Sequence, residues 1–266
     1  MPVSPSRPFV SLTTDFGVAY SGICAGVIYS IVPDATVLVL SDQVSKYAIR
    51  EGALLLRQAL PYLPTGVHVG IVDPGVGTPR DPIAVQTGRG DLLVGPDNGL
   101  LVPAAAKLGG IVRAHRLDNL DYRLPDVSTT FHGRDIFSPA AGHLALGVDL
   151  ARMGPATEPM PLALPTATAT PGLLTSQVMY VDEFGSLILA ADRADLLTAF
   201  GPVEYGTRLA VGEEPVPFQE TFGAVAPGRP LLWIDSSGAL GLAVNQGSAS
   251  RLFGLGPDST IKITLA

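Results

Sequence analysis

The sequence predicts an N-terminal α/β domain with a mostly parallel sheet, followed by a smaller C-terminal β-barrel domain. Up to about residue 150, strand-like apolar runs alternate with helix-like runs, which is typical of layered α/β folds. A proline-rich stretch between Gly154 and Gly172 then favours an extended linker. Beyond it, short apolar runs are separated by glycine turns, the pattern of a small barrel. We therefore predict a domain of residues 1–154, a linker of residues 155–172 and a second domain of residues 173–266.

In the first domain, the expected strands are short apolar runs, and the expected helices carry apolar residues at helical spacing or in small apolar blocks. The expected strands are FVSLT (9–13), TVLVLS (36–41) and VHVGIVD (67–73), followed by a hairpin of IAVQT (83–87) and DLLVG (91–95). The expected helices are ICAGVIYSIV (23–32), YAIREGALLLRQALPYL (47–63), GLLVPAAAKLG (99–109) and DIFSPAAGHLALG (135–147).

In the second domain, most expected elements are short strands. These are LLTSQVMYVD (173–182), SLILA (186–190), TRLAV (207–211), RPLLWID (229–235), ALGLAV (239–244) and TIKITLA (260–266). A helical pattern is confined to RADLLTAFG (193–201) and the turn SASRLFG (248–254).

Composition excludes several classes of function. The net charge is −7 and the chain has three lysines and no basic run, which argues against nucleic acid as the main partner. No stretch of about 18 apolar residues is present, so we expect no membrane span. The opening MPVSPSRPF lacks the pattern of a secretory signal, and a cytoplasmic location is the expectation. The single cysteine, Cys24, lies in an apolar stretch and is expected to be a small buried residue.

Polar clusters follow the expected strands, where ligands bind in open α/β sheets. Asp15 comes directly after the first strand, and Asp73 begins the turn after the third, so we favour a functional role for both. For Asp97 and Asn98, a turn or capping role is as plausible as ligand binding. The segment GVGTPR lacks the glycine pattern of a phosphate loop, and we expect its glycines to turn Asp73 and Arg80 toward one cavity.

His132 is the histidine whose surroundings best suit a working imidazole. It lies in a turn before a helix, whereas His68, His115 and His143 fall inside strand or helix patterns and are expected to be structural or solvated. A metal site built from His132, Asp73 and Asp135 is disfavoured, because the usual histidine and cysteine spacings of metal sites are absent from the sequence. We therefore expect no metal.

Taken together, these segments resemble the S-adenosylmethionine hydrolases, or hydroxide adenosyltransferases, which are related to fluorinases and chlorinases. The matching residues span nearly the whole chain: LTTDFG (12–17), VHVGIVDPGVGTPR (67–80), VGPDNGLL (94–101), TFHGRDIFSPAA (130–141), DEFGS (182–186) and NQGSA (245–249). The resemblance implies a homotrimer in which the ligand lies between the N-terminal domain of one subunit and the C-terminal domain of its neighbour. It implies S-adenosylmethionine as the substrate and no cofactor.

The family's functional residues can be assigned where the motifs match. The resemblance implies that Asp73, Arg80 and His132 position and activate water. It also implies substrate contacts from other positions. Asp15 binds the ribose hydroxyls, and Asn245 reads the adenine edge. Tyr47 and Phe184 flank the ligand, Asp182 and Ser236 hold the methionine end, and Thr130 is a further substrate contact in the TFHGRD segment. Ser186 stands where the family has an asparagine, and a water could replace the lost contact.

The same resemblance separates this chain from the halogenating relatives. Fluorinases carry a long insertion before the segment matching GPDNG, where this chain has only VQTGRGDLL. They also have Tyr, Tyr and Ser where this chain has Asp73, His132 and Gly133. These differences favour hydroxide over halide as the nucleophile.

The expected reaction is hydrolysis of S-adenosylmethionine to adenosine and L-methionine by in-line attack of water at C5′. Arg80 stays protonated and can hold a developing hydroxide, while His132 is the expected proton acceptor and Asp73 its orienting partner. Two alternatives stay open at this point. The chain could bind S-adenosylmethionine or adenosine without turnover, or it could transfer a halide as a chlorinase does.

Overall fold

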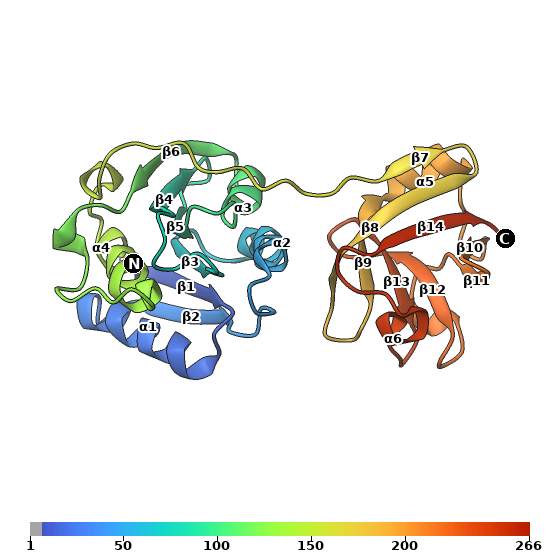
Figure 1. The fold of residues 1–266 in the computed structure, drawn as a ribbon, viewed down its shortest axis with the longest axis horizontal. Helices are drawn as coiled ribbons and strands as arrows, with labels where there is room; N and C mark the ends of the chain where they lie inside the picture. Colours follow the sequence, from blue (N-terminus) through green and yellow to red (C-terminus); the bar gives the residue numbers. More distant parts are fainter. Residues whose placement is uncertain (1–6) are drawn as a thin grey trace, which may run out of the picture. The chain divides into compact units, whose positions relative to one another are not determined.

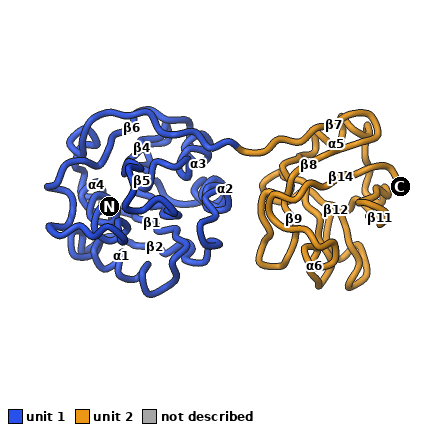
Figure 2. Tube along the Cα trace, in the orientation of Figure 1, with its two compact units in different colours: residues 1–163 blue, residues 164–266 orange. Residues whose placement is uncertain are grey.

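The computed structural model describes residues 7–266 and divides the chain into two compact units, Met1–Ala163 and Leu164–Ala266 (Figure 2). Residues 1–6, which carry most of the opening segment used for the signal-peptide prediction, lie outside the described residues. The border falls inside the stretch predicted as a linker, so that stretch is shared between the units. No helix of residues 7–266 is long and apolar enough to cross a membrane.

Unit 1 is built on a six-stranded sheet in the order β2-β1-β3-β5-β4-β6. Its strands are β1 (Phe9–Thr14), β2 (Thr36–Ser41), β3 (Val67–Ile71), β4 (Pro82–Thr87), β5 (Leu92–Pro96) and β6 (Ile111–Arg116). The four neighbouring strands β2, β1, β3 and β5 pair in parallel. β4 pairs antiparallel with both β5 and β6. The α/β character is confirmed, but the expected mostly parallel sheet is not, because the β4–β5 hairpin makes the sheet mixed.

Helices cover both faces of this sheet, as Figure 1 shows. The helices are α1 (Val18–Ile31), α2 (Ile49–Ala59), α3 (Val102–Lys107) and α4 (Ser138–Ala145), with a π-helical turn at Gly133–Phe137 leading into α4. Cys24 and Phe137 pack with Val10 and Leu12 on one face, and Leu56 packs with residues of α3 on the other. Alternate residues of β4 and β5 face the two cores, with Ala84 and Val94 in the first and Val85 and Leu93 in the second, so one core lies on each side of the sheet.

Unit 2 contains an antiparallel, nearly closed sheet that resembles a barrel, as expected. Its order is β11-β10-β14-β8-β9-β13-β12, with β7 pairing on β8. The gap between the end strands is narrowed by a bridge from Phe218 to Leu232. The elements are β7 (Thr168–Thr170), β8 (Leu173–Val181), β9 (Leu187–Asp192), α5 (Arg193–Phe200), β10 (Arg208–Val211), β11 (Glu214–Pro217), β12 (Pro230–Ile234), β13 (Ala239–Val244), α6 (Ala249–Phe253) and β14 (Thr260–Leu265).

Besides β6 of unit 1, two strands of unit 2 were not among the strands expected from the sequence. β7 lies within the predicted linker, where Pro165 and Pro171 flank it, and it adds to β8 at the margin of the sheet. β11 contains Pro215 and Pro217. It still forms a strand because it lies at the end of the sheet, where a missing backbone N–H is tolerated. Both strands depend on pairing partners rather than on their own propensity.

Candidate active site

The candidate site of unit 1 lies where two neighbouring parallel strands end. β1 and β3 are in register, with Thr14 opposite Ile71, and each continues into a polar residue within two positions, Asp15 and Asp73. The carboxyl ends of parallel strands face one edge of a sheet, which is where ligands bind in open α/β folds. The sequence-predicted carboxylates are therefore brought to the same edge.

Asp73, Arg80 and His132 form one hydrogen-bonded group. The Arg80 guanidinium donates to both carboxylate oxygens of Asp73, from Nε to Oδ1 at 3.2 Å and from Nη2 to Oδ2 at 2.5 Å. Nη2 also donates to Nδ1 of His132 at 3.2 Å. The side chains of Arg80 and Asp73 are only 7% and 6% exposed. Two segments separated by 52 positions in the chain are thus joined through one guanidinium.

Glycine makes this junction possible. Gly77 has φ +76°, and a Cβ at that position would overlap the backbone carbonyl oxygen of Thr129. The turn after β3 therefore lies directly against the segment that carries His132. A side chain at Gly77 would hold the two apart.

The hydrogen bond from Arg80 determines the tautomer of His132. A guanidinium only donates, so Nδ1 carries the lone pair and the proton of the neutral ring lies on Nε2. Burial, and then the charge of Arg80, lower the pKa of His132, while the charge of Asp73 opposes them. Burial raises the pKa of Asp73 against the opposing effect of Arg80. The imidazole is accordingly held neutral, with one basic nitrogen at the Arg80 side.

One donor of this group has no partner. Nη1 of Arg80 is buried and makes no hydrogen bond among the described residues, although every other nitrogen of the guanidinium is engaged. Because an unsatisfied buried donor is costly, such a group points to a ligand or water site. Nη1 is therefore available to donate to one small oxygen species, whose proton Nδ1 of His132 can accept only when its contact with Nη2 is released.

Asp15 and Tyr47 are linked by a strained turn. The backbone N–H of Tyr47 donates to Oδ2 of Asp15 at 2.9 Å, and Nζ of Lys46 donates to the Asp15 carbonyl oxygen. Tyr47 has φ +66°, a left-handed conformation that is uncommon for an aromatic residue, and its side chain is 72% exposed. Its ring is therefore displayed to solvent beside a carboxylate that is nearly buried. Lys46 was not predicted, and no motif pointed to it.

Thr130 borders a separate small cavity of about 440 Å³ on unit 1. Three aromatic rings meet there edge to face, those of Phe16, Tyr20 and Phe131. The guanidinium of Arg134 lies over the Phe131 ring and forms an ion pair with the buried Asp135. Asp135, considered above as a metal ligand, thus has its carboxylate occupied by Arg134 and by the Ser128 N–H.

Unit 2 carries a cavity of about 840 Å³ at the β8–β9 turn and the start of α6. Four of the sequence-predicted residues line it, namely Asp182, Phe184, Ser186 and Asn245. Oδ1 of Asp182 accepts from the N–H groups of Phe184 and Ser186 at 2.9 and 2.8 Å, which closes the turn. That turn leaves the Phe184 ring 83% exposed, and Ser186 is buried.

Asn245, Ser236 and Arg251 differ in how they relate to this cavity. Nδ2 of Asn245 donates to the Val225 carbonyl oxygen at 2.7 Å, so the amide is held by its nitrogen. Ser236 is exposed and does not line the cavity, whereas Arg251, which sequence reasoning missed, does. A short helical turn gave no sequence signal that one of its residues faces a cavity.

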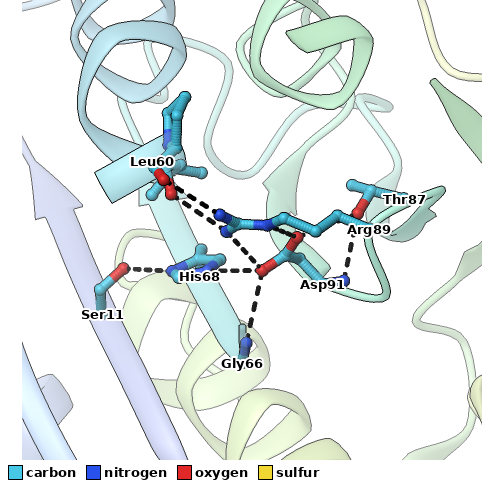
Figure 3. Close-up of polar contacts among 8 residues, drawn as sticks. Ser11, Leu60, Gly66, His68, Thr87, Arg89 and Asp91 are labelled. Atoms are coloured by element: carbon cyan, nitrogen blue, oxygen red, sulfur yellow. Dashed lines mark hydrogen bonds and ion pairs between the residues drawn. The ribbon is translucent and has the colours of Figure 1, made fainter. Parts of the chain in front are cut away.

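A second polar cluster of unit 1, formed around His68 and Asp91, is buried (Figure 3). His68 accepts from the Ser11 hydroxyl at Nδ1 and donates from Nε2 to Asp91, at 2.8 and 3.1 Å. Arg89 donates to both oxygens of the same carboxylate. Although this chain of Ser, His and Asp resembles a hydrolase triad, all three residues are at most 1% exposed, so no substrate reaches it. The predicted structural role of His68 is confirmed.

The remaining polar residues singled out above have structural contacts. Asn98 donates to the Val72 carbonyl oxygen and accepts from the Leu100 N–H, and Asp97 accepts from the Met160 N–H at 2.7 Å. For this pair the turn interpretation accounts for every contact. Cys24 is buried as predicted, and burial raises the pKa of its thiol to about 11.

Family models match both units. Residues 10–154 match the SAM hydroxide adenosyltransferase N-terminal domain, and residues 176–262 match the corresponding C-terminal domain. These two matches cover most of the chain and agree with the order of the motifs.

Individual relatives extend the match over the full length. The chain is 45% identical over 262 residues to the (R)-S-adenosyl-L-methionine hydrolase of Salinispora tropica, covering 97% of this chain and 98% of that protein. It is 26% identical to a fluorinase of Actinopolyspora mzabensis over 98% of both chains. The crystal structure of an uncharacterized conserved protein from Thermotoga maritima superimposes with a TM-score of 0.86 at 30% identity, covering 96% of this chain and 99% of that chain.

Proposed function

The chain belongs to the SAM hydroxide adenosyltransferase family, and we infer from this that it is a hydrolase that converts S-adenosyl-L-methionine to adenosine and L-methionine. The hydrolase of Salinispora tropica is far more similar to it than the fluorinase is. The observation that carries the chemistry is the free Nη1 donor of Arg80 beside the basic Nδ1 of His132.

We propose the following displacement. A water molecule accepts a hydrogen bond from Arg80 Nη1 and donates to His132 Nδ1, replacing the 3.2 Å contact that Arg80 makes there. Its oxygen forms a bond to C5′ as the C5′–S bond breaks, and that electron pair leaves on sulfur, giving the neutral thioether of methionine. The water proton passes to His132, and the charge of Asp73 stabilises the resulting imidazolium.

The displacement needs few other groups from the protein. The sulfonium is already a good leaving group, so the site has to hold water and C5′ in line rather than supply acid, metal or redox chemistry. We propose that no cofactor takes part. Asp15 binds the ribose hydroxyls, Tyr47 and Phe184 supply aromatic faces, and Asn245 contacts adenine.

We also propose that the enzyme works as a homotrimer with sites formed between subunits. The proposed residues divide between the units, with Asp73 and His132 on unit 1 and Asp182 on unit 2. The outer part of unit 1 supports association, because it exposes apolar side chains of α1 and of the end strand β2: Val18, Tyr20, Ile23, Tyr29, Leu38 and Val39. Exposed apolar surface next to an open strand edge is typical of an interface.

The test is to incubate the protein with each sulfonium epimer of S-adenosyl-L-methionine, with and without chloride or fluoride, and to separate the nucleosides by chromatography. We expect adenosine and L-methionine in equal amounts whether or not halide is present. Because the relative is named for the R epimer, we expect that epimer to be consumed faster.

Two results would contradict the proposal. A 5′-halo-adenosine that requires halide would identify a halide transferase. Binding of substrate with no product from either epimer would identify a protein that retains its ligand without turnover.

A further inference from the structure

Asp135 is a buried carboxylate three residues after His132. Its side chain is 0% exposed, and it lies in the π-helical turn Gly133–Phe137, which begins directly after the histidine. Arg134 donates to it twice, from Nε to Oδ1 at 2.6 Å and from Nη2 to Oδ2 at 3.1 Å. Burial alone would raise the pKa of Asp135, but hydrogen bonds from Arg134 and Ser128 outweigh it and hold that pKa below its usual range. A paired, ionised carboxylate is therefore buried close to the candidate base.

The same carboxylate closes the turn of residues 128–132, which we call the histidine turn. Oδ2 of Asp135 accepts from the backbone N–H of Ser128 at 2.9 Å, and Oγ of Ser128 accepts from the N–H of Phe131 at 3.0 Å. The carbonyl oxygen of Phe131 accepts in turn from the N–H groups of Arg134 and Asp135, each at 3.2 Å. The two ends of the histidine turn are thus tied to each other through Asp135.

Arg134 connects this ion pair to the side chain that precedes His132. Its guanidinium lies over the ring of Phe131, 5.2 Å from the ring centre. That ring also packs edge to face on Phe16 and Tyr20, with centroids 5.9 and 5.4 Å apart. Phe131 is therefore held by its backbone and by its side chain, and both sets of contacts involve the Arg134–Asp135 pair.

The imidazole itself has few contacts that could hold it. Among residues 7–266, its hydrogen bond is the one that Nδ1 of His132 accepts from Nη2 of Arg80 at 3.2 Å. A shift of about 1 Å in the turn would take this contact out of hydrogen-bond range. The position of the histidine turn therefore decides whether the base meets Arg80.

We propose that Asp135 is a positioning residue, which fixes the histidine turn so that Nδ1 of His132 meets Arg80. This inference rests on the proposed function, and it goes beyond it by giving a task to a carboxylate that acts through another residue. Charge-assisted hydrogen bonds are short and directional, so an ion pair holds a backbone N–H more exactly than apolar packing does.

The experiment replaces the carboxylate by an amide and follows the histidine with two readouts. In Asp135→Asn, the amide oxygen can still accept from Ser128, but its NH₂ group meets the donors of Arg134. We expect kcat for adenosine release to fall about 10²-fold, as for a misplaced catalytic group. KM should change little, because the partner of His132 is water.

The second readout is the tautomer of His132, measured by NMR of protein labelled with ¹⁵N in its histidines. The chain has four histidines, and the spectrum of His132→Ala identifies the signal. In the unmodified protein we expect the single tautomer with the proton on Nε2, since Arg80 donates to Nδ1. In Asp135→Asn we expect a mixture of both neutral tautomers, because Nδ1 loses that donor.

Asp91→Asn is the matched control. Asp91 is also a completely buried carboxylate that accepts two hydrogen bonds from a neighbouring arginine, Arg89, but it makes no hydrogen bond to the histidine turn. Its substitution should lower the free energy of unfolding and leave kcat and the His132 tautomer unchanged. Ser128→Ala is the milder variant, since it removes only the acceptor of the Phe131 N–H. It should shift both readouts in the same direction as Asp135→Asn but less, and it decides the question if Asp135→Asn does not fold.

An unchanged His132 tautomer in Asp135→Asn would overturn the proposal, as would full kcat in that variant of an active enzyme. An equal fall in kcat in Asp91→Asn would also overturn it, because general destabilisation would then be the cause. The tautomer separates this inference from the proposed function. If no protein, the unmodified one included, releases adenosine, while the tautomer changes in Asp135→Asn and not in Asp91→Asn, hydrolysis is wrong and the positioning role stands.

Discussion

At the scale of single residues, Arg80 is the centre of the candidate site. The glycines of GVGTPR predicted that Asp73 and Arg80 are turned toward one cavity, and the hydrogen bonds between these side chains show that the turn does bring them together. The sequence could not predict that the same guanidinium contacts His132, because that contact depends on how a turn after β3 and a turn before α4 meet in space. It also gave no sign of Lys46 or Arg251, since neither belongs to a strand-end cluster.

Removing the imidazole should abolish turnover without abolishing binding. For His132→Ala we expect a fall in kcat of about 10²–10⁴-fold, the usual contribution of a general base. Substrate affinity should change little, because His132 contacts the water rather than the main substrate groups. The measurement is adenosine release together with calorimetric binding. His143→Ala is the control, since His143 packs on Tyr122 outside the site. Full activity in the His132→Ala protein would contradict the role of His132 as general base.

The pH dependence follows from the direction of the His132 pKa. Burial and Arg80 lower that pKa, so the base is neutral at pH 7, and kcat/KM should fall only on the acid side, with a midpoint below the ordinary value of about 6.5. Asp73 opposes this shift, so Asp73→Asn should move the midpoint to still lower pH while reducing the rate. The pH profile of kcat/KM for both proteins checks this. A midpoint at or above the ordinary histidine value, or an upward shift in Asp73→Asn, would contradict it.

At the scale of elements, regular strands and helices were predictable because apolar periodicity determines which face is buried. The strands β1, β2 and β3 and the β4–β5 hairpin follow the sequence pattern closely. β7 and β11 do not, because their prolines disfavour a strand unless a neighbour pairs with them. The π-helical turn at Gly133–Phe137 was not expected: the predicted helix began at Asp135, and the extra residue in a turn leaves no mark on periodicity.

The turn after β3 gives a prediction about Gly77. Gly77→Ala would place a methyl group against the Thr129 carbonyl oxygen and push the Arg80 turn away from His132. We expect kcat to fall about 10²-fold, as for a small misplacement of a catalytic group. Steady-state assay of adenosine release measures it.

Gly110→Ala is the control for Gly77→Ala. Gly110 also has positive φ (+85°), but no atom lies within 4 Å of its added Cβ. Backbone strain alone should therefore leave kcat unchanged. If both substitutions lowered kcat equally, strain rather than displacement of Arg80 would be the cause.

The buried cluster around Asp91 should contribute to stability and not to activity. Although burial opposes it, hydrogen bonds from Arg89 and His68 hold the pKa of Asp91 below its usual range. Asp91→Ala leaves these donors without their acceptor and should lower the free energy of unfolding by about 3–5 kcal/mol. Urea unfolding at neutral pH measures this. The control is Asp126→Ala, at an exposed position, which should change the free energy of unfolding little. An Asp91→Ala protein of normal stability but reduced kcat would instead place the cluster in catalysis.

At the scale of the whole molecule, the proposed site residues are distributed over two compact units. Asp15, Asp73, Arg80 and His132 belong to unit 1, whereas Asp182, Phe184 and Asn245 belong to unit 2. The proline-rich stretch in the sequence was enough to predict a division of the chain. Which copy of unit 2 serves a given unit 1 is not encoded in any local pattern, because apolar surface marks an interface without naming its partner.

Mixed subunits test this directly. One variant carries His132→Ala, which disables unit 1, and the other carries Asp182→Ala, which disables unit 2. Co-expressed with different tags and purified through both, each trimer contains both variants. If every site takes unit 1 from one subunit and unit 2 from its neighbour, each trimer that contains both variants restores one of its three sites, and activity should reach about one third of that of the unmodified enzyme. If both units of a site come from one chain, no site is restored and the mixture stays as inactive as its parents. Mixing separately purified, non-exchanging trimers is the control, because it brings the same chains together without forming new interfaces.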